Sequence, residues 1–249
     1  MALQINRKVK HLATLNNQFR FLIDDKYVVY VTVEPDLLPN DDWSFINFIS
    51  FPPGDWNQGH ISKDQHTGSL GFSSISYNIV PGVKNIWHQT QIDHLEFEQP
   101  CSLSQNIRIV THPFFRDPVI IKFASFPCQI DYIETETIIY NRLQGTGISP
   151  EFLGHVTEEG RGVIGFVLEL IAGSRPAEPR DLTICQDVLA RLHALGIKHG
   201  DIHGGNFLVR EGKALLIDFE ISHLCDEKKE LELEYDHLTK LLGGCKRGN

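Results

Sequence analysis

The sequence predicts an α+β fold in which strands dominate the first two-thirds of the chain and helices the last third. Runs rich in β-branched and aromatic residues, bounded by turn residues, predict the strands. These runs lie at 19–23, 27–33, 107–111, 119–124, 152–156 and 163–170. Apolar residues at three- and four-residue intervals predict helices over 129–143, 181–195 and 226–242.

Length and composition narrow the class of protein. The chain has 249 residues, which suits one two-lobed domain or two small ones. It contains no apolar run long enough for a membrane span, and its net charge of −9 argues against binding to a nucleic-acid backbone. The five cysteines form no C-x-x-C pair, and the first eight residues lack an apolar leader. We therefore predict a cytoplasmic protein without a nucleic-acid or membrane partner.

Residues 1–91 are predicted to form a β-rich extension. The strands at 19–23 and 27–33 flank Asp24-Asp25-Lys26, which predicts a hairpin. The segment 52–71 is polar and rich in glycine, and no strand is predicted there. Trp87 is interpreted as a packed side chain beside a surface histidine, in preference to a cap over a ligand.

The next predicted strands, 94–97 and 107–111, are joined by a connection that contains no glycine, 99–106. The strand 119–124 then carries Lys122 inside an apolar run. An unpaired buried ammonium group is costly, so Lys122 requires a partner.

The helix over 129–143 supplies that partner. Glu136 shares its inner face with Ile133 and Tyr140, whereas Glu134 lies off that face and is the weaker candidate. We predict an ion pair between Lys122 and Glu136. The alternative is a solvated Glu136 on a surface helix.

Two more helices follow the strand 163–170. The first begins near Asp181 and ends at Gly196, with His193 interpreted as a structural residue. The second covers 226–242. Its inward face is predicted to consist of Leu231, Tyr235, Leu238, Leu241 and Leu242.

Between these helices lies the most informative stretch, 199–220. Two apolar runs, 207–209 and 214–217, flank a turn at 211–213 and predict a hairpin. With a three-residue turn, Asn206 would face Asp218 at the open end of the hairpin. An amide oxygen and a carboxylate on directly opposed residues are close enough to share a Mg²⁺ ion. Asp201 would lie beside them, free to face a hydroxyl group.

This ordered set of residues resembles the catalytic centre of the protein-kinase-like superfamily. His-x-Asp-x-x-x-x-Asn over 199–206, followed by Asp218-Phe219, is similar to the kinase catalytic loop and metal-binding triplet. His203 and Glu220 resemble the aminoglycoside phosphotransferase and choline kinase branch. The motif string as a whole is also similar to uncharacterised fungal kinase-like proteins, and the short C-terminal part resembles the kinase of the KEOPS tRNA-modification complex.

The resemblance covers about residues 92 to 242 and implies a minimal two-lobed kinase-like fold. The extension would occupy 1–91, the N-terminal lobe 92–170 and a truncated C-terminal lobe 171–249. The cofactors implied are ATP and Mg²⁺. The glycine-free connection, 99–106, stands where kinases have a glycine-rich cover over the phosphates.

The resemblance also implies roles for single residues. Lys122, fixed by Glu136, would hold the phosphates, and main-chain groups from Glu169 to Ile171 would bind the adenine edge. Asn206 and Asp218 would hold Mg²⁺, Asp201 would deprotonate the acceptor, and His203 would place a donor near the transferred group. Asp236 resembles an aspartate that binds the catalytic-loop backbone, and a solvated surface aspartate is an equal alternative.

The predicted function is ATP- and Mg²⁺-dependent phosphoryl transfer to a hydroxyl group. A small-molecule acceptor ranks first, because His203 and Glu220 favour it and the activation segment of protein kinases is missing. The alternatives are an atypical protein Ser/Thr kinase that works in a complex with a protein partner, or a nucleotide- or substrate-binding scaffold without phosphoryl transfer.

Overall fold

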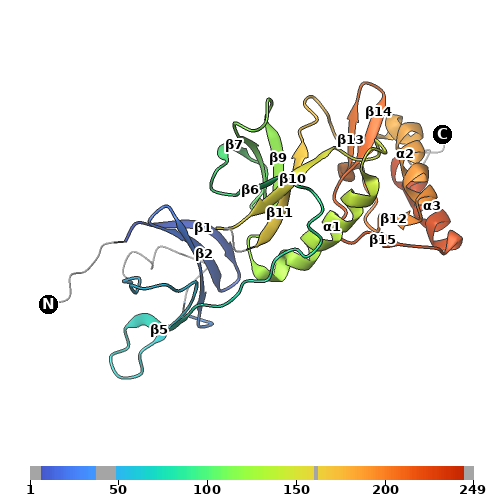
Figure 1. Cartoon of the computed structure of the whole chain (residues 1–249). Coiled ribbons are helices and arrows are strands. Elements are labelled where there is room, and N and C mark those ends of the chain that lie inside the picture. Colours follow the sequence, from blue (N-terminus) through green and yellow to red (C-terminus); the bar gives the residue numbers. More distant parts are fainter. Residues whose placement is uncertain (1–6, 38–48, 160–161, 244–249) are drawn as a thin grey trace.

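The computed structural model describes residues 7–37, 49–159 and 162–243, apart from the side chains of 99 and 100. It is an α+β protein with two separate sheets, followed by a smaller part that holds two of the three α-helices (Figure 1). The prediction about an apolar leader concerns residues that lie largely outside these ranges. Cys245 also lies outside them, and the four described cysteines are free thiols. No helix in the described ranges is long and apolar enough to cross a bilayer.

The first sheet lies in the N-terminal extension and has five strands in the order β1-β2-β3-β4-β5. The strands are β1 (Val9–Leu15), β2 (Gln18–Ile23), β3 (Tyr27–Val33), β4 (Gln58–Lys63) and β5 (Leu70–Ser76). The predicted hairpin is confirmed, since β2 and β3 pair around a turn in which Asp24 and Asp25 both have positive φ. The strands β1, β4 and β5 were not predicted. In the region of β4 and β5, the polar, glycine-rich composition hid the period-2 pattern.

The second sheet has six strands in the order β6-β10-β11-β9-β8-β7. They are β6 (Gln91–Asp93), β7 (Glu98–Ser102), β8 (Ile107–Thr111), β9 (Val119–Phe123), β10 (Phe152–Thr157) and β11 (Val163–Glu169). The strand predicted at 94–97 is wrong. The carboxylate of Asp93 accepts a hydrogen bond from the backbone of Leu95 at 3.0 Å, and this closes a turn, so that the strand starts at Glu98.

The helix α1 (Ile130–Leu143) packs against the second sheet. Its predicted inner face is confirmed, with Ile133, Tyr140 and Leu143 all buried. One hydrophobic cluster joins this helix and sheet to the C-terminal part through residues such as Phe166, Phe207 and Phe219. The second sheet and the C-terminal part therefore share a core.

The C-terminal part contains α2 (Leu182–Ala194), α3 (Lys228–Gly243) and two small sheets. The small sheets pair β12 (Ile197–Lys198) with β15 (His223–Leu224), and β13 (Phe207–Arg210) with β14 (Lys213–Leu216). Gly196 ends α2 with a φ of +68°, as predicted. Leu241, predicted to face inward, is 47% exposed, because the buried face of α3 consists of Glu234, Leu238 and Leu242.

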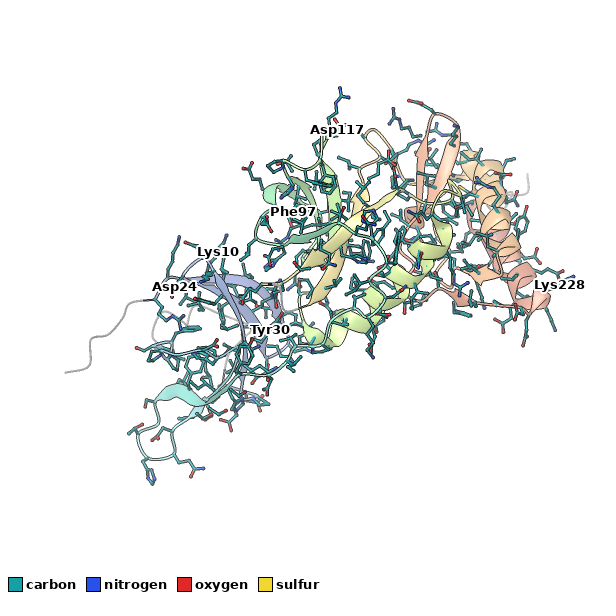
Figure 2. All side chains as sticks on the ribbon, in the orientation of Figure 1. Lys10, Asp24, Tyr30, Phe97, Asp117 and Lys228 are labelled. Atoms are coloured by element: carbon teal, nitrogen blue, oxygen red, sulfur yellow. The ribbon has the colours of Figure 1, made fainter. Side chains whose placement is uncertain are left out.

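The first sheet is attached to the rest of the chain through a buried polar contact. Figure 2 labels Tyr30 where this sheet meets the remainder of the molecule. Its hydroxyl donates to Glu158 at 2.8 Å, and the guanidinium of Arg20 also pairs with Glu158. All three residues are buried. An unpaired carboxylate at Glu158 would be costly, so the contact ties the extension firmly to the second sheet.

Candidate functional site

Lys122 is the centre of the candidate site. It lies in β9 and is 6% exposed. Its Nζ lies 2.5 Å from Glu136 Oε1, 2.7 Å from Asp218 Oδ1 and 2.8 Å from Glu220 Oε1. Burial alone lowers the pKa of Lys122, but the carboxylates of Glu136 and Asp218 outweigh it and raise the pKa above its usual value. Lys122 is therefore a cation surrounded by three acids.

The predicted ion pair between Lys122 and Glu136 is confirmed as a contact. Glu136 is 1% exposed, and its second oxygen accepts a hydrogen bond from the backbone of Phe219 at 3.2 Å. Burial raises the pKa of Glu136 to about 7, against the opposing effect of Lys122. This one carboxylate thus joins β9, α1 and the Asp218-Phe219 segment.

Glu134, the weaker candidate, points elsewhere. Its carboxylate accepts hydrogen bonds from the backbone of Lys84 at 2.5 Å and Asn85 at 3.2 Å. The phase predicted for the helix is therefore correct.

The predicted register of the 207–217 hairpin is wrong by one residue. Glu211 and Gly212 have φ of +51° and +73° and form a two-residue turn, so Arg210 faces Lys213 and not Ala214. The backbone of Ile217 then donates to Asn206 at 3.0 Å. Asp218, with a φ of +67°, lies one residue beyond the position opposite Asn206.

Asn206 and Asp218 consequently have different partners. Asn206 Nδ2 donates to the backbone oxygen of Asp201 at 2.8 Å and to its carboxylate at 3.2 Å. Asp218 instead binds Lys122. The oxygens of Glu136, Asp218 and Glu220 lie within 4.8 Å of one another and are of the type that Mg²⁺ prefers, but the ammonium of Lys122 contacts all three in this structure. The sequence indicated Glu220 only as a resemblance to the aminoglycoside phosphotransferase and choline kinase branch and did not predict its contact with Lys122.

Asp201 and His203 form the exposed side of the site. The side chain of Asp201 is 53% exposed, and His203 Nε2 lies 3.5 Å from its carboxylate. His203 Nδ1 accepts a hydrogen bond from the backbone of Gly205 at 3.1 Å. The carboxylate of Asp201 is thus open to solvent and flanked by donors.

The helix α3 supports the loop that carries Asp201 through hydrogen bonds to Glu234. The buried carboxylate of Glu234 accepts from the backbone of His199 at 3.0 Å and of Gly200 at 2.7 Å, and from His193 Nε2 at 2.8 Å. Burial alone raises the pKa of Glu234, but these donors reverse the effect and lower it. Asp236 is exposed, so the alternative of a solvated surface aspartate is correct for it. The spacing of Glu234 from Leu238 and Leu242 could have identified it.

His199 fixes the same loop from the other side. It is fully buried, its Nε2 donates to the backbone oxygen of Ile217 at 3.0 Å, and its Nδ1 accepts from the backbone of Asp201 at 3.3 Å. Gly200 has a φ of +88°, and a Cβ there would lie 2.9 Å from the backbone oxygen of Ile221. Only glycine suits this position, which explains the His-Gly-Asp sequence.

Glu169 and Ile171 lie where β11 leaves the second sheet. Glu169 is exposed at the end of the strand, and its backbone N–H donates to Glu151 at 2.9 Å. The carbonyl of Ile171 accepts from Ser174 at 3.1 Å in the turn that follows. Adenine binding at these residues stays a prediction.

The glycine-free connection is shorter than predicted, since β7 extends to Ser102. The turn is closed by Ser104, whose hydroxyl accepts from the backbone of Ile107 at 3.1 Å. Gln105 Nε2 donates to the backbone oxygen of Thr14 in β1 at 2.9 Å. The turn is therefore attached to the first sheet.

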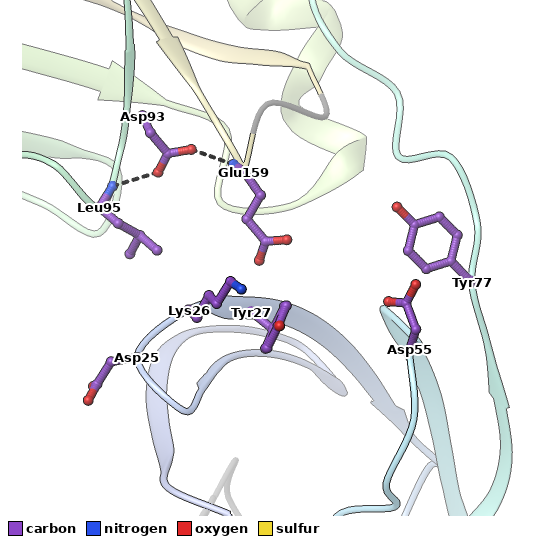
Figure 3. Close-up of a pocket in the computed structure, with 8 residues that line it drawn as sticks. All are labelled: Asp25, Lys26, Tyr27, Asp55, Tyr77, Asp93, Leu95 and Glu159. Carbon is purple, nitrogen blue, oxygen red and sulfur yellow. Dashed lines mark hydrogen bonds between the residues drawn. The ribbon is translucent and has the colours of Figure 1, made fainter.

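A separate pocket of about 540 Å³ lies between the first sheet and the start of the second (Figure 3). Its lining includes Asp25, Lys26, Tyr27, Asp93 and Glu159, and none of the predicted site residues. The ammonium of Lys26 lies 4.8 Å from the centre of the Tyr27 ring, and Asp93 accepts from the backbone of Leu95 and Glu159. Lys26 and Asp93 thus already have partners within the protein.

Comparison with known proteins gives partial matches. The chain is 31% identical over 111 residues to a probable bifunctional tRNA threonylcarbamoyladenosine biosynthesis protein of Methanothermobacter thermautotrophicus, covering 43% of this chain and 20% of that protein. It is 31% identical over 102 residues to the KEOPS complex subunit Bud32 of Pyrococcus abyssi, covering 36% of this chain and 44% of that subunit. The chain thus spans less than half the length of these relatives. No family model matches the chain.

These relatives support the resemblance to the kinase-like superfamily and do not support the aminoglycoside phosphotransferase and choline kinase branch. The prediction of a small-molecule acceptor and of no nucleic-acid partner is contradicted, because the relatives are named for a protein complex and for tRNA modification. The net charge of −9 is a poor guide to partners, because it describes the whole chain and not one surface or an assembled complex.

Proposed function

We propose that this protein is an ATP-using, kinase-like enzyme that works inside a protein complex associated with tRNA modification. In this proposal, residues 92–170 and 171–249 form its two lobes and residues 1–91 its extension. The reaction is that of an atypical protein Ser/Thr kinase, which transfers a phosphoryl group to a protein hydroxyl. The similarity to a KEOPS subunit supports the setting.

One observation carries the proposal. The ammonium of Lys122 lies within 2.8 Å of carboxylates from α1 and from the segment after β14. A cation shared by three acids is more than a structural ion pair needs. Such clusters of perturbed groups are typical of functional sites.

Each half of the site has its own role. Lys122 binds the nucleotide phosphates and is oriented by Glu136, while backbone groups from Glu169 to Ile171 bind the adenine edge. Asp218, with Asn206 or Glu220, supplies oxygen ligands for Mg²⁺. Magnesium, when bound, neutralises charge on the phosphates.

Asp201 faces the acceptor in this account. Its exposed carboxylate accepts the proton of the attacking hydroxyl, and its hydrogen bond with Asn206 fixes its direction. His203 donates a hydrogen bond near the transferred group.

A second candidate is a nucleotide-binding scaffold without phosphoryl transfer. The turn between β7 and β8 motivates it, because it lacks the glycines that let such a loop close over phosphates.

Calorimetry with ATP, with and without Mg²⁺, tests the proposal together with an assay of ATP turnover. We expect the wild-type protein to bind Mg·ATP and to turn it over. Binding of Mg·ATP without any turnover or transfer, in the presence of the protein's natural complex, would contradict the kinase function and support the nucleotide-binding scaffold. For the variants Asp201→Asn and Asp218→Asn, which remove the proposed base and metal ligand, Asp187→Asn is a matched control, because it makes the same change on an exposed face of α2.

A further inference from the structure

The helix α1 is held from outside by the segment that leads from the first sheet to the second. The carboxylate of Glu134 accepts hydrogen bonds from the backbone of Lys84 at 2.5 Å and Asn85 at 3.2 Å. The indole Nε1 of Trp87 donates to the backbone oxygen of Thr137 at 3.1 Å. These two contacts lie on either side of Glu136, the residue that binds Lys122.

The segment itself is anchored in the second sheet. Val83 is buried, and its backbone donates to Val163 at 2.8 Å. The Trp87 ring packs on Phe152, with centroids 4.5 Å apart. Because this segment is fixed to the second sheet, its hydrogen bonds to α1 can restrain the position of the helix.

The first sheet contacts the chain between Lys122 and α1. The guanidinium of Arg20 lies 5.6 Å from the centre of the Phe123 ring, next to Lys122. The Tyr30 ring packs on Phe126, which directly precedes the turn into α1, with centroids 6.3 Å apart. Phe123 and Phe126 are both buried.

We propose that the first sheet and the segment 77–87 act as a positioning element for α1, with Glu134 as the positioning residue that keeps Glu136 against Lys122. The proposal rests on the proposed function in one respect, namely that Lys122 and Glu136 serve nucleotide binding. Hydrogen bonds to a carboxylate are the strong ones, and Glu134 receives two of them from a fixed backbone. Loss of Glu134 would free α1 at the turn that carries Glu136.

The test compares Glu134→Ala with Asp131→Ala, an exposed acid at the start of the same helix. Two quantities are measured: hydrogen exchange of the α1 amides in the nucleotide-free protein, and the dissociation constant of Mg·ATP. We expect Glu134→Ala to increase exchange in α1 about tenfold and to weaken Mg·ATP binding about tenfold. Asp131→Ala should change neither, and Glu134→Gln, which keeps one acceptor oxygen, should restore part of both.

Unchanged exchange in α1 of Glu134→Ala would overturn the proposal. Faster exchange with Mg·ATP binding equal to wild type would also overturn it, because Glu134 would then be structural only. If wild type does not bind Mg·ATP, the proposed function fails, and the exchange experiment still decides whether Glu134 holds α1. Should Glu134→Ala fail to fold, Glu134→Gln and Trp87→Phe provide the same comparison.

Discussion

The two halves of the candidate site differ in how they are held. Lys122 is 6% exposed and is fixed by three carboxylates within a sheet and helix that share the main core. The Asp201 side chain is 53% exposed, and its loop depends on backbone hydrogen bonds to Glu234 and His199. The side around Lys122, for which we propose nucleotide binding, is therefore largely buried, whereas the side around Asp201, for which we propose acceptor binding, is open and supported by polar contacts.

Asp218→Asn is the largest perturbation of the buried half. It removes a carboxylate that binds Lys122 and serves as a proposed Mg²⁺ ligand. We expect Mg²⁺-dependent ATP turnover to fall to the detection limit while the fold remains intact by circular dichroism. Turnover equal to that of wild type would show that Asp218 is not a metal ligand.

Asp201→Asn tests the open half separately. A general base contributes in the transition state, so its loss should lower the transfer rate by about 10²–10⁴-fold and leave Mg·ATP affinity nearly unchanged. The two constants can be obtained by calorimetry and a turnover assay on the same preparation. A loss of Mg·ATP affinity as large as the loss of transfer rate would place Asp201 on the nucleotide side and remove the distinction between the two halves.

The second sheet should be sensitive to acid at His155 in β10. Burial lowers the pKa of His155 to about 4, with a smaller effect from His88, and its Nε2 accepts from the backbone of His88 at 3.2 Å. Because the folded pKa is below the unfolded value, stability is present above pH 6.5 and decreases as the pH falls toward 4. The expected loss is about 3 kcal/mol.

Denaturant unfolding at several pH values measures this loss. His155→Gln keeps an acceptor but does not titrate, so its unfolding free energy should vary less with pH. An identical pH dependence in both proteins would assign the acid sensitivity to another group.

Glu234→Gln should have the smallest effect. It keeps one acceptor oxygen but removes the charge that receives His193 and two backbone donors. We expect the free energy of unfolding to fall by about 1.5 kcal/mol, with a larger relative effect on turnover than on Mg·ATP affinity. Asp236→Asn, an exposed change two residues away, is the control, and equal effects of the two variants would contradict the role of Glu234.

The two halves of the site also differ in how far the sequence could predict them. The Lys122–Glu136 contact followed from helical phase and the cost of an unpaired ammonium, both of which are local. The register of the 207–217 hairpin failed because Glu211, a residue with a side chain, adopts positive φ and shortens the turn. The spacing of Glu234 from Leu238 and Leu242 could have placed it on the inner face of α3, but its support of the Asp201 loop depends on how α3 packs against that loop. The strands β4 and β5 were missed because pairing, and not composition, forms them.

The most direct test of the account is a calorimetric titration of wild type and Lys122→Met with Mg·ATP. We expect wild type to bind Mg·ATP and Lys122→Met to bind it at least about tenfold more weakly, since the variant loses the cation proposed to contact the phosphates. Hydrogen exchange in α1 of the variant would confirm that the helix is still in place. Failure of wild type to bind, or equal binding by a folded Lys122→Met protein, would contradict a nucleotide site at Lys122.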